Sequence, residues 1–455
     1  MLPIVTPDEM RAVDAAAAEP TEVLVHRAGA AVARAAVRMM GGTYGRTVHV
    51  IVGKGNNGAD GRVAAQLLAA KGVRVRVVDA ADPPIELPPA DLVIDAAYGT
   101  GFRGVWSPPE VGDTPVLAVD VPSGIDALTG GADGLVLLAT RTVTFQALKP
   151  GLLVPPGSQL AGAVELADIG LGDAVEQHVH AHLVQPSDVA DWLPSRGIYA
   201  HKWRAAVRVI AGSVGMTGAA ALTSRAAMRS GAGMVQLSGV GTLVVDAPVE
   251  VVQRPVAGAG WSKAVLGSLD RFHSLVIGPG LGRDDVTTAE ARAVVLEAGV
   301  PTVIDGDGLF AMAWNAEGAA NLLRRRTMPT VLTPHDGEYS LLTGAPPIAD
   351  RFAAARRLSF DTGAVVLLKG PTTVVADPDG HVLVVTTGDE RLATAGTGDV
   401  LAGIVGALLA QGVPAFEAAA AGAWLHGRAA GLAPARGMVA ADIAEHLPAV
   451  FEALQ

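Results

Sequence analysis

The chain is built from short apolar runs that end in a glycine or polar turn and are followed by a helical pattern. In the first half, such runs occupy 47–52, 73–78, 91–95, 116–120 and 141–146. Strand and helix patterns that alternate in this way predict a parallel sheet covered on both faces. The pattern restarts near residue 205, so the sequence predicts two α/β domains.

The second half repeats the strand pattern but ends differently. Apolar runs begin near 206, 274, 302, 330 and 364, and each ends in a glycine or polar turn. Residues 372–388 contain Pro-Asp-Gly between two β-rich runs, which predicts an antiparallel hairpin. Two helices, at 397–411 and about 416–431, are expected to close the chain. The polar, proline-broken segment 182–204 predicts a boundary between domains at 1–190 and 200–455.

Composition narrows the class of protein. A chain of 455 residues is too long for one ordinary core, and with 50% hydrophobic and 17% charged residues it is expected to fold compactly. A net charge of −11 argues against nucleic-acid binding. The sequence shows neither a membrane-spanning stretch nor a signal-peptide pattern, which favours a cytoplasmic location. The absence of cysteine excludes thiol chemistry. Apolar, alanine-rich helices favour a homo-oligomer.

Three glycine-rich loops in the first half follow predicted strands. They read GKGNNGADG at 53–61, DAAYGTGFRG at 95–104 and VDVPSGIDALTG at 119–130. The first has neither dinucleotide-fingerprint nor Walker spacing. The carboxyl ends of parallel strands are where open α/β sheets bind ligands, so the three loops together predict a binding site. Alternatively, the first loop is an ordinary strand-to-helix turn, and a single strand-end aspartate is a cap.

The segment AGTGDVLAG at 395–403 places glycines and an acid where a helix begins. Gly396, Thr397 and Gly398 would present free backbone N–H groups, which suit an anion. Asp399 permits two interpretations. It can cap the helix, because acids complement the dipole of a first turn. It can also be the general base of a phosphoryl transfer, because a base must accept the proton of the attacking hydroxyl.

Two neighbouring motifs favour the second interpretation. VLLKGPTTVVAD at 366–377 places Lys369 at a strand end, where a lysine can meet phosphate or simply be exposed. LTPHDGEYSLLTG at 332–344 places His335 after another strand. A loop histidine is more often a surface residue than a ligand contact, so His335 carries little weight alone.

The three loops of the first half, in this order, resemble the NAD(P)H-hydrate epimerase domain over about residues 1–190. The resemblance implies a Rossmann-like three-layer αβα fold, with Asp120 as the acid/base. It implies a potassium site at Asn57, Asp95 and Ser123. Ala59 stands where the family pattern has glycine, and alanine disfavours positive φ. The implied substrate contacts are Asn56, Asn57, Gly58, Ala59, Asp60, Gly99, Thr100, Gly101, Phe102, Arg103, Gly104, Val105 and Asp120.

The second half resembles the ribokinase-like fold and, more narrowly, the ADP-dependent NAD(P)H-hydrate dehydratases over about residues 200–455. The motifs GSVGMTGAA, GPGLG, TPHDGE, KGPTTV and AGTGDVLAG carry this resemblance. It implies contacts of Ala219, Gly282, His335 and Asp399 with the hydrated dinucleotide. It implies that Lys369, Gly370, Pro371, Thr372, Thr373 and Gly398 hold the adenine nucleotide. Mg²⁺ is expected on the nucleotide phosphates.

These resemblances predict a bifunctional enzyme that repairs hydrated NADH and NADPH. One domain interconverts the R and S hydrates, and the other dehydrates the S form with ADP, releasing AMP and phosphate. The predicted partners are therefore the two hydrates and ADP, with K⁺ and Mg²⁺ as cofactors. Two alternatives stay open from the residues. A small-molecule kinase shares the Gly-Thr-Gly-Asp loop, and a nucleotide-binding sensor without activity fits the same motifs.

Overall fold

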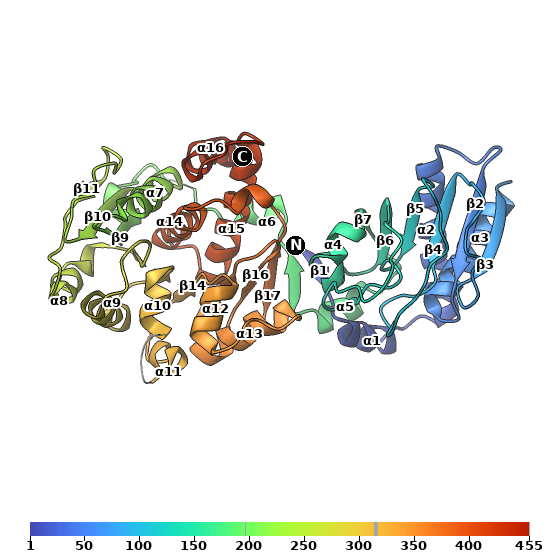
Figure 1. Ribbon diagram of the computed structural model, residues 1–455, viewed down its shortest axis with the longest axis horizontal. Helices are drawn as coiled ribbons and strands as arrows, with labels where there is room; N and C mark the ends of the chain where they lie inside the picture. Colours follow the sequence, from blue (N-terminus) through green and yellow to red (C-terminus); the bar gives the residue numbers. More distant parts are fainter. Residues whose placement is uncertain (196, 314–316, 455) are drawn as a thin grey trace. The chain divides into compact units, whose positions relative to one another are not determined.

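The computed structural model describes residues 1–195, 197–313 and 317–454, which form two compact units (Figure 1). One unit contains Leu2–His182, and the other contains Met1 and the chain from Leu183 onward. The segment 182–204, expected as a polar boundary, includes the ordered helix α6 (Pro186–Trp192). None of the described helices is both long and apolar enough to cross a membrane.

The first unit is organised by a parallel sheet in the order β3-β2-β4-β5-β6-β7. Because β3 lies on one side of β2 and β4 on the other, the strand order reverses at β2 and β4. Such a reversal opens a crevice at the carboxyl ends of these strands. The elements up to Leu183 are β1 (Leu2–Ile4), α1 (Pro7–Ala15), α2 (Thr21–Met40), β2 (Thr47–Val52), α3 (Asn56–Ala70), β3 (Arg74–Asp79), β4 (Leu92–Ala96), β5 (Val116–Val119), β6 (Arg141–Phe145), α4 (Gly157–Leu160), β7 (Ala163–Ala167), α5 (Gly172–His178) and β8 (Ala181–Leu183). β1 and β8 are not strands of this sheet, and β8 spans the boundary between the units.

Both faces of this first sheet are covered, as in other parallel sheets. Successive strand residues point to opposite faces, so Val48 and Val50 lie in one core with α2, α3 and α5. Ile51 and Val93 belong to a second core with Trp106. On that side, the packing residues come from the long connections that follow β3, β4 and β5 rather than from helices.

The second unit contains a sheet with the order β11-β10-β9-β12-β13-β14-β15-β16-β17. Its strands are parallel from β11 to β15, and β16 and β17 form the predicted antiparallel hairpin. The strand order reverses between β9 and β12. The strands are β9 (Ala206–Ser213), β10 (Met234–Val240), β11 (Val252–Gln253), β12 (Ser274–Ile277), β13 (Thr302–Ile304), β14 (Thr330–Leu332), β15 (Val365–Leu368), β16 (Thr373–Ala376) and β17 (Val382–Val385).

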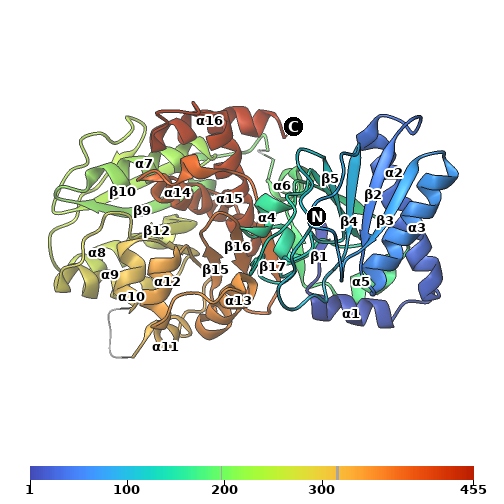
Figure 2. The same cartoon turned by 45° about the vertical axis from the view of Figure 1, so that its right-hand side comes forward.

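Helices lie on both sides of this second sheet (Figures 1 and 2). Those on one side are α7 (Thr217–Arg229), α14 (Thr397–Ala410), α15 (Ala415–Leu432) and α16 (Ala440–Glu452). Those on the other are α8 (Trp261–Leu266), α9 (Asp285–Glu297), α10 (Asp307–Ala313), α11 (Ala319–Leu323), α12 (Asp336–Thr343) and α13 (Arg351–Thr362). Gly406 lets α14 lie directly against β12, because a Cβ there would come within 2.2 Å of Val276 Cγ2.

The α/β class and the parallel sheets are confirmed, but two local predictions are wrong. The chain closes with three helices rather than two, because α16 follows α15 despite Pro448 in its last turns. The sequence also predicted a loop at 53–61, yet α3 already begins at Asn56. The turn-like composition of this stretch is overridden by packing. Gly61, for example, lies so close to β4 that a Cβ would meet the Ala96 methyl at 2.5 Å.

Candidate active sites

The carboxyl edge of the first sheet brings together Asp95, at the end of β4, and Ser123, in the loop after β5. Asp95 is fully buried and accepts hydrogen bonds from the backbone N–H and the hydroxyl of Ser123, at 2.9 and 2.6 Å. Burial raises the pKa of Asp95, and these hydrogen bonds oppose the rise. Among the described residues, no ion pair joins this carboxyl to a lysine or arginine.

Asn57 lies in the first turn of α3 at the same edge of the sheet. Its side chain is buried, and neither its amide oxygen nor its amide nitrogen has a hydrogen-bond partner within the protein. A buried amide without partners is costly unless a ligand satisfies it. Together, Asn57, Asp95 and Ser123 provide oxygen ligands of the kind that alkali and other hard cations prefer. The residues present therefore fit the expected potassium ion.

Asp120 follows β5 and belongs to a charged cluster that the sequence did not reveal. Its Oδ1 lies 2.6 Å from Nζ of Lys149, whose side chain is only 1% exposed. The Thr144 hydroxyl donates to the same oxygen at 3.1 Å. Burial, reinforced by the negative charge of Asp120, raises the pKa of Asp60 to about 8. At neutral pH Asp60 is therefore mostly protonated, near the ion pair of Asp120 with Lys149.

The expected substrate loop from Gly99 to Val105 borders Asp120. A Cβ placed on Gly99 would lie 3.4 Å from the side chain of Asn57 and 3.5 Å from Oδ2 of Asp120. The rest of the loop is exposed or half-buried, and Phe102 stacks near Tyr98 with ring centroids 4.5 Å apart. Arg103 is exposed and donates to the Phe102 carbonyl. Ala59 lies within α3, where no positive φ is needed, so its replacement of glycine causes no backbone strain.

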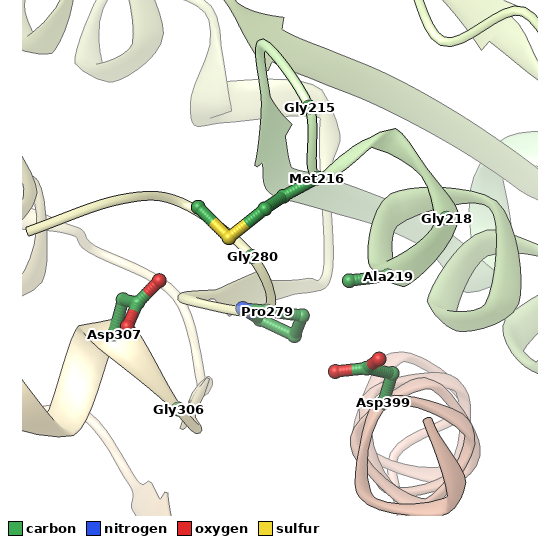
Figure 3. Close-up of a pocket in the computed structure, with 9 residues that line it drawn as sticks. All are labelled: Gly215, Met216, Gly218, Ala219, Pro279, Gly280, Gly306, Asp307 and Asp399. Atoms are coloured by element: carbon green, nitrogen blue, oxygen red, sulfur yellow. The ribbon is translucent and has the colours of Figure 1, made fainter. Parts of the chain in front are cut away.

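The second unit contains a pocket of about 430 Å³ at the carboxyl edge of β9, β12 and β13 (Figure 3). Asp399, from the first turn of α14, and Asp307, at the start of α10, face it from different sides, with Ala219 of α7 close to Asp399. Glycine turns allow the close approach of backbone at this edge. The complete lining is Gly215, Met216, Gly218, Ala219, Pro279, Gly280, Gly306, Asp307 and Asp399.

Asp399 has the electrostatic setting of a general base. Burial raises its pKa to about 7, and Asp305 adds to the rise, whereas Lys369 opposes it. A carboxyl whose pKa lies near the working pH both accepts and returns a proton readily. The backbone carbonyl of Asp399 accepts from the hydroxyl of Thr223 on α7, which fixes the start of α14 against that helix.

Lys369, after β15, lies beside the start of α14. Its Nζ is 3.0 Å from Oδ1 of Asp305 and 3.4 Å from Oε2 of Glu338. A Cβ on Gly398 would lie only 3.5 Å from this ammonium nitrogen. Burial alone would lower the pKa of Lys369, but these carboxylates more than offset it and raise the pKa above its usual value. The ammonium group of Lys369 therefore lies beside the N-terminal turn of α14.

His335 does not line the pocket, but it connects to the same cluster. It is the N-cap of α12, where its Nδ1 accepts from the backbone N–H groups of Gly337 and Glu338. With Nδ1 an acceptor, the neutral ring carries its proton on Nε2, which lies 3.6 Å from Glu338. Gly282 does not line the pocket either, but its N–H donates to Asp307, which does. The substrate contacts of both residues stay predictions.

The remaining predicted nucleotide residues form the turn between β15 and β16. Gly370 and Pro371 are exposed, Thr372 is buried and Thr373 begins β16. Arg351 braces this turn by donating to the Lys369 carbonyl at 2.9 Å.

Sequence reasoning missed Lys149, Asp305 and Asp307 as site residues. Asp305 directly follows β13, whereas Asp307 and Lys149 lie a few residues beyond the ends of β13 and β6, so only proximity to strand ends could have indicated them. Among the described residues, no group of three His, Cys, Asp or Glu side chains is arranged to hold a metal ion. The pocket carboxylate Asp307 still fits Mg²⁺ carried by a nucleotide, which needs only one or two protein carboxylates besides phosphates and water.

Comparisons with known proteins agree with this two-site arrangement. A family model described as NAD(P)H-hydrate dehydratase matches residues 207–449, and one described as YjeF-related protein N-terminus matches 21–87 and 79–151. The bifunctional NAD(P)H-hydrate repair enzyme of Mycobacterium leprae is 38% identical over 449 residues, which cover 91% of this chain and 90% of the relative. The chain belongs to the bifunctional NAD(P)H-hydrate repair enzyme family.

Solved structures extend the family assignment to the fold of the second unit. The ADP/ATP-dependent NAD(P)H-hydrate dehydratase of Bacillus subtilis, co-crystallised with ATP and Mg²⁺, is 30% identical, with a TM-score of 0.52. The match covers 60% of this chain and 98% of that one. A ribokinase-like superfamily protein of Enterococcus faecalis is 22% identical and has the same TM-score. That match covers 60% of this chain and 96% of the Enterococcus protein. The predicted ribokinase-like fold is therefore confirmed.

Proposed function

We propose that this chain repairs hydrated NADH and NADPH with two separate active sites. The first unit interconverts the R and S hydrates. The second unit dehydrates the S hydrate with ADP and yields the reduced cofactor, AMP and phosphate. Membership of the repair-enzyme family supports both activities. The observation that carries the proposal is Asp399, a pocket carboxyl with a pKa of about 7, next to a lysine and a helix N-terminus.

In the second unit, the obstacle to dehydration of the substrate is that hydroxide is a poor leaving group. Asp399 takes the proton of the substrate hydroxyl, and the hydroxyl oxygen then bonds to the terminal phosphorus of ADP while the bond from that phosphorus to the AMP oxygen breaks. Lys369 and the free N–H groups near Gly398 stabilise the charge on the phosphates. Phosphate then departs with the former hydroxyl oxygen, and loss of a proton from the adjacent ring carbon restores the double bond.

The remaining residues of the second unit position the two substrates. The turn from Lys369 to Thr373 holds the nucleotide, and Arg351 keeps that turn in place. Ala219, Gly282 and His335 contact the hydrated dinucleotide. Asp307 would hold nucleotide-borne Mg²⁺, which supplies positive charge to the phosphates when bound. Self-association of the chain stays a prediction from its apolar helices.

In the first unit, Asp120 is the acid/base that moves the proton needed for epimerisation at the hydrated carbon. The start of α3, from Asn56 to Asp60, and the loop from Gly99 to Val105 hold the dinucleotide, where free N–H groups suit its phosphates. Asn57, Asp95 and Ser123 would hold K⁺, which supplies a positive charge beside the buried carboxylate of Asp95. The orphaned Asn57 amide supports this assignment.

A direct assay tests the proposed function. Purified wild-type chain is given a mixture of R and S NADPH hydrate with ADP, with ATP or without nucleotide. The proposal predicts that ADP restores the absorbance of reduced nicotinamide and releases phosphate, while chromatography shows catalysed exchange between the epimers without any nucleotide. A stable phosphorylated product would instead indicate a small-molecule kinase. Binding without turnover would indicate a sensor.

A further inference from the structure

Two turns with positive φ follow neighbouring strands of the first sheet. Asp120, after β5, has φ 65°, and Gln146, after β6, has φ 61°. Among the described residues, no other non-glycine side chain has a positive φ. Each turn is closed by a hydrogen bond between the residues on either side, from Val121 N to Val119 O at 2.8 Å and from Ala147 N to Phe145 O at 2.7 Å. Such γ-turns are rare and strained, so the surrounding structure must hold them in place.

Lys149 is the side chain that contacts both turns. Its buried Nζ donates to the carbonyls of Phe145 and Ala147, both at 3.1 Å, and so binds the backbone on each side of Gln146. It also donates to the Thr144 hydroxyl at 2.9 Å and pairs with Oδ1 of Asp120 at 2.6 Å. A lysine ammonium has three N–H donors and no acceptor, so these four oxygens share three donors and leave none free.

The two oxygens of Asp120 therefore have different surroundings. Oδ1 is held by Lys149 and by the Thr144 hydroxyl. Oδ2 lies on the side of Gly99, where a Cβ would come within 3.5 Å of it. Gly99 begins the loop proposed to hold the substrate. One oxygen is thus anchored in the protein, and the other faces the place where the substrate is expected.

We propose that Lys149 is a positioning residue for the epimerisation. It locks the Asp120 turn and the orientation of its carboxyl group, so that Oδ2 is the oxygen that exchanges the proton with the substrate. This inference rests on the proposed function of the first unit. A positioning role predicts a loss in kcat rather than in substrate affinity, because Lys149 itself does not touch the substrate.

Two threonines on β6 offer a matched pair of variants. Thr142 and Thr144 are both fully buried, and they point to the same face of the sheet because they are two residues apart. Thr142 donates to the Ala161 carbonyl, whereas Thr144 joins Lys149 to Asp120. Thr144→Val removes part of the clamp, and Thr142→Val removes a comparable buried hydrogen bond outside it.

The experiment measures epimerase kcat and KM of the full-length variants, with dehydratase activity as an internal measure of folded protein. Lys149→Met is expected to lower kcat about 100-fold and Thr144→Val about 10-fold, and both should keep a KM within threefold of wild type. Thr142→Val is expected to keep the kcat and KM of the wild type. Hydrogen exchange at residues 119–121 and 145–147 is expected to rise in the first two variants only. If Lys149→Met fails to fold, Thr144→Val still decides the inference.

Two results separate this inference from the proposed function. If the wild type epimerises the hydrates and both Thr144→Val and any folded Lys149→Met keep a wild-type kcat, the positioning role is overturned and the proposed function stands. If the wild type does not accelerate epimer exchange at all, the proposed function of the first unit is overturned, and the positioning role falls with it. A loss of activity equal in Thr142→Val and Thr144→Val would also overturn the role.

Discussion

Lys369 and Asp305 form an ion pair of 3.0 Å at the carboxyl edge of the second sheet, directly beside Gly398 in the first turn of α14. Asp305 is further held by the Thr333 hydroxyl at 2.7 Å. The ammonium group is therefore fixed where nucleotide phosphates would meet the helix N-terminus. A preorganised charge of this kind stabilises a transition state without reorganising during the reaction.

Removal of that charge should weaken nucleotide binding. Lys369→Met is expected to raise the KM for ADP by about 10- to 100-fold, since a hydrogen bond to a charged group contributes about 1.5–3 kcal/mol. Steady-state dehydratase kinetics at varied ADP measure the effect. Lys263→Met, which changes an exposed lysine on α8, is the control. An unchanged KM for ADP in Lys369→Met would show that this lysine does not contact the nucleotide.

The raised pKa of Asp399 predicts how the dehydratase responds to pH. A general base acts only when it is ionised, so kcat/KM should rise with pH and reach half of its plateau near pH 7 in the free enzyme. At pH 6 the expected rate is about one tenth of the plateau. Initial rates between pH 5 and pH 9 at low substrate concentration measure this profile. A rate that is already maximal at pH 5 would contradict the assignment.

The raised pKa of Asp399 also predicts that stability falls as pH rises, whereas dehydratase activity increases. Because Asp399 has a pKa of about 7 when folded and 3.8 as its ordinary value, the folded state holds more protons between these pH values, and ionisation at high pH destabilises it. Asp399→Asn should therefore raise the free energy of unfolding at pH 8 by at most about 4 kcal/mol, and by little at pH 4. Thermal unfolding of both proteins at the two pH values measures this difference. Equal stabilisation at both would argue against a buried charge.

The close packing of the turn after β2 against the end of β4 can be tested with two neighbouring glycines. A Cβ on Gly53 would lie 1.9 Å from the Ala97 carbonyl oxygen, whereas a Cβ on Gly55 would have nothing within 4 Å. Gly53→Ala should destabilise the first unit by about 1–3 kcal/mol or more, and Gly55→Ala by about 1 kcal/mol or less. Calorimetric unfolding of the full chain is the measurement. Similar losses in both variants would show that this contact is wrong.

The sequence predicted most strands of both sheets, because buried parallel strands appear as short apolar runs between turns. It missed β7, β10 and β11. It failed where tertiary packing outweighs local preference. The Asn-Asn-Gly start of α3 is typical of a turn, and only its fit against β2 and β4 explains the helix there. For α16, the proline at 448 concealed a helix whose apolar face is covered by α7, α14 and α15.

The sequence predicted only those residues of the candidate sites that lie within recognisable motifs. Asp399 was recognised because a glycine loop and an apolar helix frame it in the sequence. Lys149 was not, because its significance depends on contacts with Asp120, 29 positions earlier, and with the turn at Gln146. Asp305 was missed for the same reason, since its partner Lys369 is 64 residues away. Pairings of this kind follow from strand order, which local patterns do not specify.

The central claim is that two separate carboxylates, Asp399 and Asp120, carry two separate reactions. The direct test follows Asp399→Asn and Asp120→Asn on mixed R and S NADPH hydrate with ADP, recording both NADPH formation and epimer composition. The account predicts that Asp399→Asn loses dehydration by about 10²- to 10⁴-fold but still interconverts the epimers. Asp120→Asn should convert the S hydrate at the wild-type rate and then stall on the R hydrate. Full dehydration by Asp399→Asn, or full conversion of both epimers by Asp120→Asn, would contradict the account.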